Sequence, residues 1–216
     1  LFLSSLKNKD LTDTLSGPYT YSWENIHEKI NILSNYLKKI ISKGNRCILL
    51  SENRPEWLIS DIAIMNTGGV TVPLFTTYSE NDYEYIIKDC GPKVCIFSDL
   101  EQFKKIKNYI TEKTILISID QFDEKIDFFE HIFLKARTSL EILKDSVISY
   151  NDKLRRNDLA CIIYTSGTTG NPKGVMLSHG GILSNCEGAQ EILKSLTKKD
   201  PPVFLTWLPL SHSYEH

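Results

Sequence analysis

The sequence "DLACIIYTSGTTGNPKGVMLSH", from Asp158 to His179, joins an apolar run to a loop rich in glycine, serine and threonine. Its first eight residues predict a buried strand that leads directly into the loop. Three glycines, four serine or threonine hydroxyls and Lys173 then lie between Tyr164 and Gly174. Glycines let a main chain approach a ligand closely, and successive N–H groups in such a loop point at an anion. The stretch predicts a phosphate-binding loop, with a plain surface turn between a strand and a helix as the alternative.

The remainder of the chain alternates between expected strands and expected helices. Short apolar runs predict strands at "RCILLS" (46–51), "VTVPL" (70–74), "KVCIFS" (93–98), "TILISI" (114–119) and "VFLTWLPL" (203–210). Apolar stripes at helical spacing predict helices over 23–40, 55–67, 80–90, 100–110 and 182–196. Residues 120–157 show charged and aromatic helical turns without a clear boundary. The alternation favours the α/β class, with mostly parallel sheets flanked by helices.

Several of the expected helices carry capping signals at their ends. Ser22 is placed to be an N-cap, Pro55 occupies a first helical turn, and Ser79 with Asp82 forms a capping-box pattern. Gly91 is expected to end the helix that Ser79 begins, because glycine accepts the backbone conformation that closes many helices.

The composition is that of an ordinary globular protein, with 41% hydrophobic residues, 24% charged residues and a net charge of −2. A chain of 216 residues can bury a substantial core, as one large domain or as part of a bigger one. The near-neutral charge gives no support to nucleic-acid binding. The apolar runs are too short to span a bilayer, and the first ten residues show no signal-peptide pattern. We therefore predict a cytoplasmic location, with peripheral contact at a membrane left open.

The cysteines are five in number, and most have apolar neighbours: Cys47, Cys90, Cys95, Cys161 and Cys186. This favours buried reduced thiols over a disulfide framework. Cys90 and Cys95 have a spacing that a zinc site could use, but no second pair with ligand spacing follows, so we predict no metal there.

Two common nucleotide-binding patterns do not fit the loop. The Walker pattern requires glycine immediately before the lysine, whereas Pro172 precedes Lys173 and Gly174 follows it. The dinucleotide pattern G-x-G-x-x-G requires a first glycine pair that Gly167 and Gly170 do not supply.

The stretch "YTSGTTGNPKGVMLSH" closely resembles the phosphate-loop signature of the adenylate-forming enzymes, which include acyl-CoA synthetases, luciferases and peptide-synthetase adenylation domains. Every position of that specific signature, T-S-G-T-T-G-x-P-K-G, is present. The N-terminal segments of the family are similar to "YTYSWENIHEKINILSNYL", "ILLSENRPEWLISDIAIMNTGGVTVPLFTT" and "DCGPKVCIFSD". The segment "WLPLSHSYEH" resembles the next family motif in its long-chain fatty acid–CoA ligase form. The resemblance covers nearly the whole chain, with 120–157 its least characteristic part.

The resemblance implies a two-step reaction, fatty acid–CoA ligation. A carboxylate attacks the α-phosphate of ATP to give an acyl-adenylate and pyrophosphate, with Mg²⁺ offsetting phosphate charge, and coenzyme A then displaces AMP to form a thioester. In such steps a protein mainly positions groups and stabilises charge. The implied phosphate-binding residues are Thr165, Ser166, Gly167, Thr168, Thr169, Gly170 and Lys173. Lys173 and His212 are the implied catalytic residues, with His212 beside the acyl pocket near the adenylate carbonyl.

The resemblance also implies that residues 1–216 are an incomplete N-terminal AMP-binding domain, the first part of the family's large domain. The family pattern continues with an acidic Mg²⁺-associated motif, a ribose-binding aspartate, a hinge and a small C-terminal domain with a catalytic lysine. We therefore expect the 216 residues alone to be poorly soluble and inactive, and to require the C-terminal segment in cis or as a second chain. A truncated, non-catalytic product of a broken or split gene is the main alternative.

A remote alternative uses the last residues of the chain. His212, Glu215 and His216 fit the H-x-x-E-H zinc pattern of one metalloprotease group. That chemistry needs a third ligand, which is not seen downstream. A purely structural role for these histidines is a further alternative.

Overall fold

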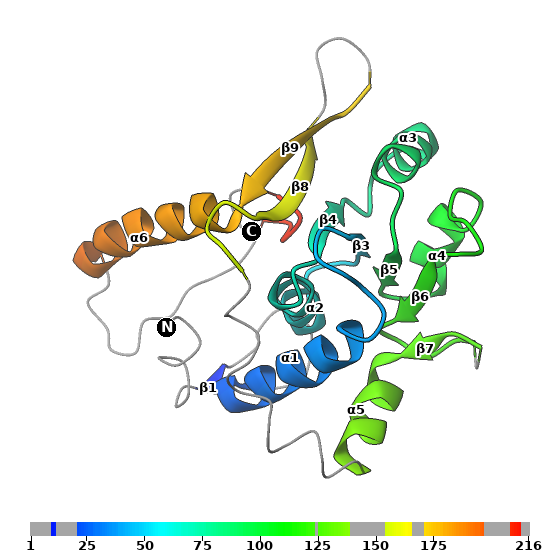
Figure 1. The fold of residues 1–216 in the computed structure, drawn as a ribbon, viewed down its shortest axis with the longest axis horizontal. Coiled ribbons are helices and arrows are strands. Elements are labelled where there is room, and N and C mark those ends of the chain that lie inside the picture. Colours follow the sequence, from blue (N-terminus) through cyan, green and yellow to red (C-terminus); the bar gives the residue numbers. More distant parts are fainter. Residues whose placement is uncertain are drawn as a thin grey trace.

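The computed structural model describes residues 10–11, 21–123, 125–138, 154–165, 171–196 and 208–212. A seven-stranded sheet forms its centre, in the order β7-β6-β5-β3-β4-β8-β9 (Figure 1). The strands of this sheet are β3 (Arg46–Leu50), β4 (Val70–Leu74), β5 (Val94–Phe97), β6 (Ile115–Ser118), β7 (Asp127–Phe128), β8 (Leu159–Thr165) and β9 (Lys173–Ser178). All neighbours pair in parallel except β8 and β9, which are antiparallel. A separate antiparallel pair joins β1 (Asp10–Leu11) to β2 (Tyr21–Ser22).

Helices cover both faces of the parallel sheet (Figure 1). They are α1 (Trp23–Leu37), α2 (Pro55–Asn66), α3 (Glu80–Cys90), α4 (Leu100–Ile106), α5 (Phe129–Thr138) and α6 (His179–Leu196). Apolar side chains of α1, α2 and α5 pack with Cys47, Leu49 and Ile96 on one face. Those of α3 and α4 pack with Ile48 and Leu50 on the other. Successive residues of β3 therefore point into two separate cores, which explains why the run "CILL" is apolar without alternation.

The predicted α/β class and the predicted capping signals are confirmed. The Ser22 hydroxyl accepts a hydrogen bond from the Asn25 amide at 3.1 Å and begins α1. Ser79 and Asp82 form the capping box of α3, and Gly91 ends that helix with a φ of 52°. Such a left-handed backbone suits glycine because a Cβ would be strained there.

Two expectations are corrected by the structure, and two stretches without an assigned element are found to contain regular structure. Residues 173–178, to which the sequence assigned no element, form β9. The helix predicted over 100–110 ends at Ile106, where the Tyr109 amide donates at 3.0 Å to the Ile106 carbonyl three residues back and begins a turn. The unassigned stretch from 120 contains β7 and α5. Residues 208–210 form part of a turn rather than the end of a strand, and 203–207 lie outside the described residues.

All five cysteines are free thiols, and four of them are buried. Burial raises the pKa of Cys47 and that of Cys90 to about 12, so both are neutral thiols at pH 7. Among the helices of the described residues, none combines the length and the apolar character needed to cross a bilayer.

Candidate functional site

The loop predicted to bind phosphate connects two strands at one edge of the sheet. Thr165 is the last residue of β8 and Lys173 the first residue of β9, and the two lie directly opposite each other in the antiparallel pair. Both residues are exposed. Because β3, β4 and β8 are parallel, their carboxyl ends lie at this same edge, where α/β proteins commonly bind ligands. The strand pairing thus holds a hydroxyl and an ammonium group at the two ends of the loop.

Two of the seven predicted phosphate-binding residues lie in the part of the chain that the structure describes. It brings Thr165 and Lys173 together as cross-strand neighbours. Five further residues lie outside the described residues, and their assignment stays a prediction: Ser166, Gly167, Thr168, Thr169 and Gly170.

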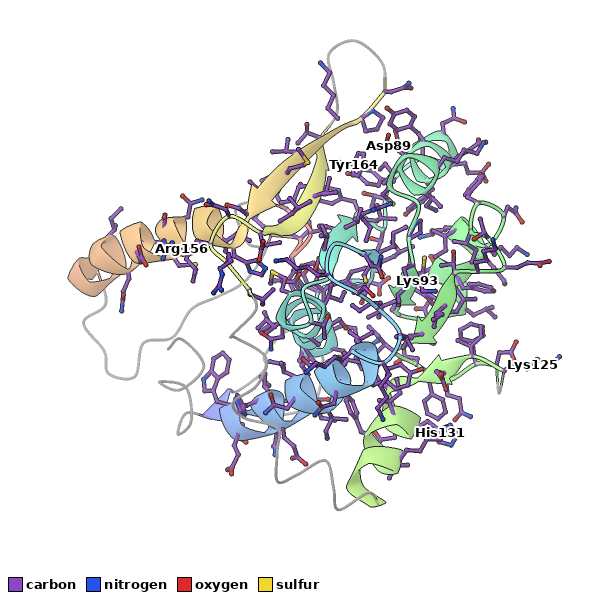
Figure 2. The ribbon with its side chains drawn as sticks, in the orientation of Figure 1. Asp89, Lys93, Lys125, His131, Arg156 and Tyr164 are labelled. Atoms are coloured by element: carbon purple, nitrogen blue, oxygen red, sulfur yellow. The ribbon has the colours of Figure 1, made fainter. Side chains whose placement is uncertain are left out.

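Tyr164 fixes the strand end that carries Thr165. Its phenol donates a hydrogen bond to Asp89 Oδ2 of α3 at 2.5 Å, and Figure 2 shows both side chains between β8 and α3. Its main-chain carbonyl accepts a hydrogen bond from the phenol of Tyr78 at 2.9 Å. Burial, together with the Asp89 carboxylate, raises the pKa of Tyr164 well above its usual value. Burial first, and the Asp82 charge second, raise the pKa of Tyr78 to about 12, so both phenols keep their protons at pH 7.

His212 lies in a turn at the same edge of the sheet. Its main-chain amide donates to the Pro209 carbonyl at 2.8 Å, and Ser211 beside it is 4% exposed. The imidazole is exposed and meets the ring of Phe75 edge-on, with 6.4 Å between the ring centroids. Phe75 directly follows β4, so this contact places His212 at the carboxyl end of a strand adjacent to β8.

Asn53 connects the end of β3 to the turn that carries His212. Its side-chain Nδ2 donates to the Leu208 carbonyl at 2.6 Å, and its Oδ1 accepts from the Leu210 amide at 2.8 Å. Sequence reasoning missed both Asn53 and Tyr78. The contacts of Asn53 span 155 and 157 residues, so no local pattern indicates them. The contact of Tyr78 spans 86 residues.

A cavity of about 530 Å³ lies beside the loop that joins β3 to α2, on the side of α1 and α5. Charged side chains that line the cavity form hydrogen bonds with one another. The Arg54 guanidinium donates to Asp120 through two hydrogen bonds of 3.0 Å and to Glu56 at 2.9 Å. The Tyr21 phenol donates to the second oxygen of Glu56 at 2.8 Å. These contacts stabilise the β3–α2 loop and tie it to β2 and to the end of β6.

The metal that the resemblance implies finds no ligand set in the part of the chain that the structure describes. In that part, no three histidine, cysteine, aspartate or glutamate side chains converge as a metal site requires. The resemblance places the acidic Mg²⁺-associated motif after these 216 residues, and we derive no step through Mg²⁺. Glu215 and His216 lie outside the described residues, so the zinc pattern stays a prediction.

Comparisons with known proteins agree on one family. A family model described as "AMP-binding enzyme" matches residues 5–216. Fatty acyl-CoA synthetase A of Dictyostelium discoideum is 31% identical over 216 residues, covering 95% of this chain and 31% of that protein. Long chain acyl-CoA synthetase 3 of Arabidopsis thaliana is 29% identical, covering 97% of this chain and 33% of that protein. The chain thus spans about a third of the length of these curated relatives.

Solved structures share the fold. ATP-bound MatB from Rhodopseudomonas palustris superposes with a TM-score of 0.72 at 24% identity, covering 93% of this chain and 37% of that one. The anthranilate CoA ligase AuaEII, in complex with anthranoyl-AMP, gives a TM-score of 0.65 at 24% identity, covering 81% of this chain and 32% of that one.

Proposed function

Since the chain belongs to the AMP-binding enzyme family, we propose that it forms the N-terminal part of a fatty acid–CoA ligase. Two curated relatives, at 29% and 28% identity, are named long chain acyl-CoA synthetases, which supports a long-chain substrate. The substrates of the proposed enzyme are a fatty acid, ATP and coenzyme A.

The proposed reaction has two displacements. A carboxylate oxygen of the fatty acid forms a bond to the α-phosphorus of ATP, and the bond from that phosphorus to the pyrophosphate oxygen breaks. The thiolate sulfur of coenzyme A then forms a bond to the acyl carbon, and the bond from that carbon to the AMP oxygen breaks. The thiol proton leaves to solvent before this second attack.

One observation carries the proposal: Thr165 and Lys173 lie opposite each other at the carboxyl edge of the sheet, at the two ends of a complete signature loop. In the proposed complex the Lys173 ammonium neutralises charge on the β- and γ-phosphates, and the Thr165 hydroxyl donates to them. Main-chain N–H groups of the loop residues 166–170 complete the cradle. His212 lies beside the acyl group, near the carbonyl of the adenylate.

The proposal is tested by exchange of labelled pyrophosphate into ATP, catalysed by the full-length protein that contains these residues. We expect exchange that depends on a fatty acid and is fastest with long-chain acids, and acyl-CoA formation when coenzyme A is added. No exchange with short-, medium- or long-chain acids would contradict the ligase. Elemental analysis of the same sample tests the zinc alternative, which requires one tightly held zinc that is lost in His216→Ala.

We further propose that the activity needs a segment equivalent to the remainder of the relatives, in cis or as a second chain. The 216 residues tested alone should then give no acyl-CoA. Addition of that segment should restore both solubility and ATP-dependent activity. A truncated, non-catalytic product would stay inactive under both conditions.

A further inference from the structure

We propose that Asn53 is a positioning residue, whose carboxamide holds the turn at 208–212 and so sets where His212 lies at the carboxyl edge of the sheet. The kinetic consequence of this inference rests on the proposed function, whereas the structural consequence does not.

The carboxamide of Asn53 uses both of its polar atoms on one short segment. It donates to the Leu208 carbonyl at 2.6 Å and accepts from the Leu210 amide at 2.8 Å. This is the pattern of hydrogen bonds that a neighbouring strand would make to residues 208 and 210. Both bonds are partly shielded from water, so losing a partner leaves a main-chain group poorly satisfied. The turn is thereby held to the end of β3.

The loop that carries Asn53 is fixed on both sides of it. The Glu52 carboxylate accepts a hydrogen bond from Gln102 Nε2 of α4 at 2.7 Å. The Arg54 guanidinium binds Asp120 through two hydrogen bonds of 3.0 Å. Pro55 then begins α2 with a restricted backbone. Asn53 therefore projects from a rigid base, as precise positioning of a second segment requires.

His212 lies only two residues after Leu210, so the position of the turn constrains the position of His212. Leu210 packs against the core on the side of α1 and α2, Ser211 is buried, and the His212 amide donates to the Pro209 carbonyl. The His212 ring is exposed and meets the ring of Phe75 edge-on. Displacement of the turn should therefore move the imidazole, while the hairpin that carries Lys173 is held separately by Tyr78 and Asp89.

Three substitutions at Asn53 separate the two hydrogen bonds. Asn53→Ala removes both of them. Asn53→Asp keeps an acceptor for the Leu210 amide but places a negative charge against the Leu208 carbonyl. Asn53→Gln keeps the donor and the acceptor on a longer side chain and should restore part of the function. The matched control is Asn108→Asp, which makes the same charge change at an exposed residue after α4.

The first readout is hydrogen exchange measured on the full-length protein. We expect the peptide that contains residues 208–212 to exchange about tenfold faster in Asn53→Ala and in Asn53→Asp, with less change in Asn53→Gln. Peptides from β3 and β8 should keep their exchange rates. Unchanged exchange at 208–212 in both variants overturns the proposal, whether or not the protein activates fatty acids. Equal acceleration in all peptides, with no recovery in Asn53→Gln, also overturns it, since Asn53 would then stabilise the domain generally.

The second readout is a double-mutant cycle on acyl-adenylate formation. Asn53→Ala should lower kcat/KM for the fatty acid about tenfold and leave the KM for ATP within about twofold, because the phosphate loop is anchored elsewhere. In a His212→Ala background the same change should have a much smaller effect, because the two residues act through one imidazole position. Additive effects of the two substitutions would show that Asn53 does not act through His212. A wild-type protein without activity would refute the proposed function and leave the exchange result to decide the role of Asn53.

Discussion

The phenol of Tyr78 donates a hydrogen bond to the main-chain carbonyl of Tyr164, with 2.9 Å between the two oxygen atoms. Tyr78 comes from the connection between β4 and α3, and Tyr164 directly precedes Thr165 at the end of β8. The bond therefore joins two neighbouring strands at the point where the signature loop leaves the sheet. A residue outside the signature thus holds the main chain directly before that loop.

Tyr78→Phe should weaken ATP binding in the full-length protein. The substitution removes one partly buried hydrogen bond, worth about 1 kcal/mol, and leaves the ring packing in place. We expect the KM for ATP to rise about fivefold in pyrophosphate exchange, with little change in the KM for the fatty acid. Tyr109→Phe is the matched control, because that ring is also partly buried in the same core. An equal KM for ATP in the two variants would show that the loop does not depend on Tyr78.

Lys173→Ala should slow adenylation in the full-length protein. A charge-assisted contact to phosphate contributes about 1.5–3 kcal/mol, so the exchange rate should fall by about ten- to a hundredfold. Lys107→Ala removes an exposed lysine at the end of α4 and should leave the rate unchanged. A Lys173→Ala enzyme that exchanges pyrophosphate at the wild-type rate would refute the assignment of this loop to phosphate binding.

Gly174→Ala should disturb the hairpin that holds the loop. A Cβ at Gly174 would lie 2.8 Å from Ile162 Cγ2 and 3.3 Å from the ring of Tyr164, so the opposing side chains must shift. We expect a lower unfolding temperature and slower pyrophosphate exchange. Gly188→Ala is the control, since nothing lies within 4 Å of a Cβ there. In the middle of α6 it should raise stability by about 0.5–1 kcal/mol. Equal changes of the unfolding temperature and of the exchange rate in both variants would mean that the close contact at Gly174 affects neither stability nor activity.

Local signals predicted the elements of the parallel sheet closely. α3 and β4 have the predicted bounds, because each combines a clear apolar pattern with a marker at its end. For α3 these markers are the Ser79 capping box and Gly91. The strand β9 had no such signal. Val175, Met176 and Leu177 are consecutive apolar residues, so the segment shows no alternation between apolar and polar positions. Met176 is 71% exposed and Val175 is 45% exposed, so the segment is not a buried strand either. They form a strand because β8 lies beside them, which a local pattern does not reveal.

The candidate site was predictable only where its residues form a continuous motif. Thr165 and Lys173 belong to the signature, and their pairing across the hairpin is new information from the structure. Asn53 and Tyr78 act on segments far away in the sequence, through side-chain contacts with main-chain groups. A main-chain partner leaves no mark in the sequence, because every residue offers the same carbonyl and most offer the same amide.

The junction of β9 and α6 should be sensitive to mild acid through His179. Partial burial lowers the pKa of this imidazole below its usual value, against the opposing effect of the nearby Asp158 carboxylate. Its Nε2 is buried without a hydrogen-bond partner among the described residues. The main chain at this point is tied to the start of β8, since the His179 amide donates to the Asp158 carbonyl at 3.0 Å.

The sign of the pH effect follows from this depressed pKa. In the unfolded chain a histidine takes up its proton near a pH of about 6.5, whereas folded His179 takes it up only at lower pH. The unfolded state therefore binds more protons between these two values, and the free energy of unfolding should fall as the pH is lowered through about 6.5. His179→Gln should flatten this part of the stability curve in urea unfolding measured at a series of pH values. A slope that is retained in His179→Gln would show that the acid sensitivity does not arise from His179 at the β9–α6 junction.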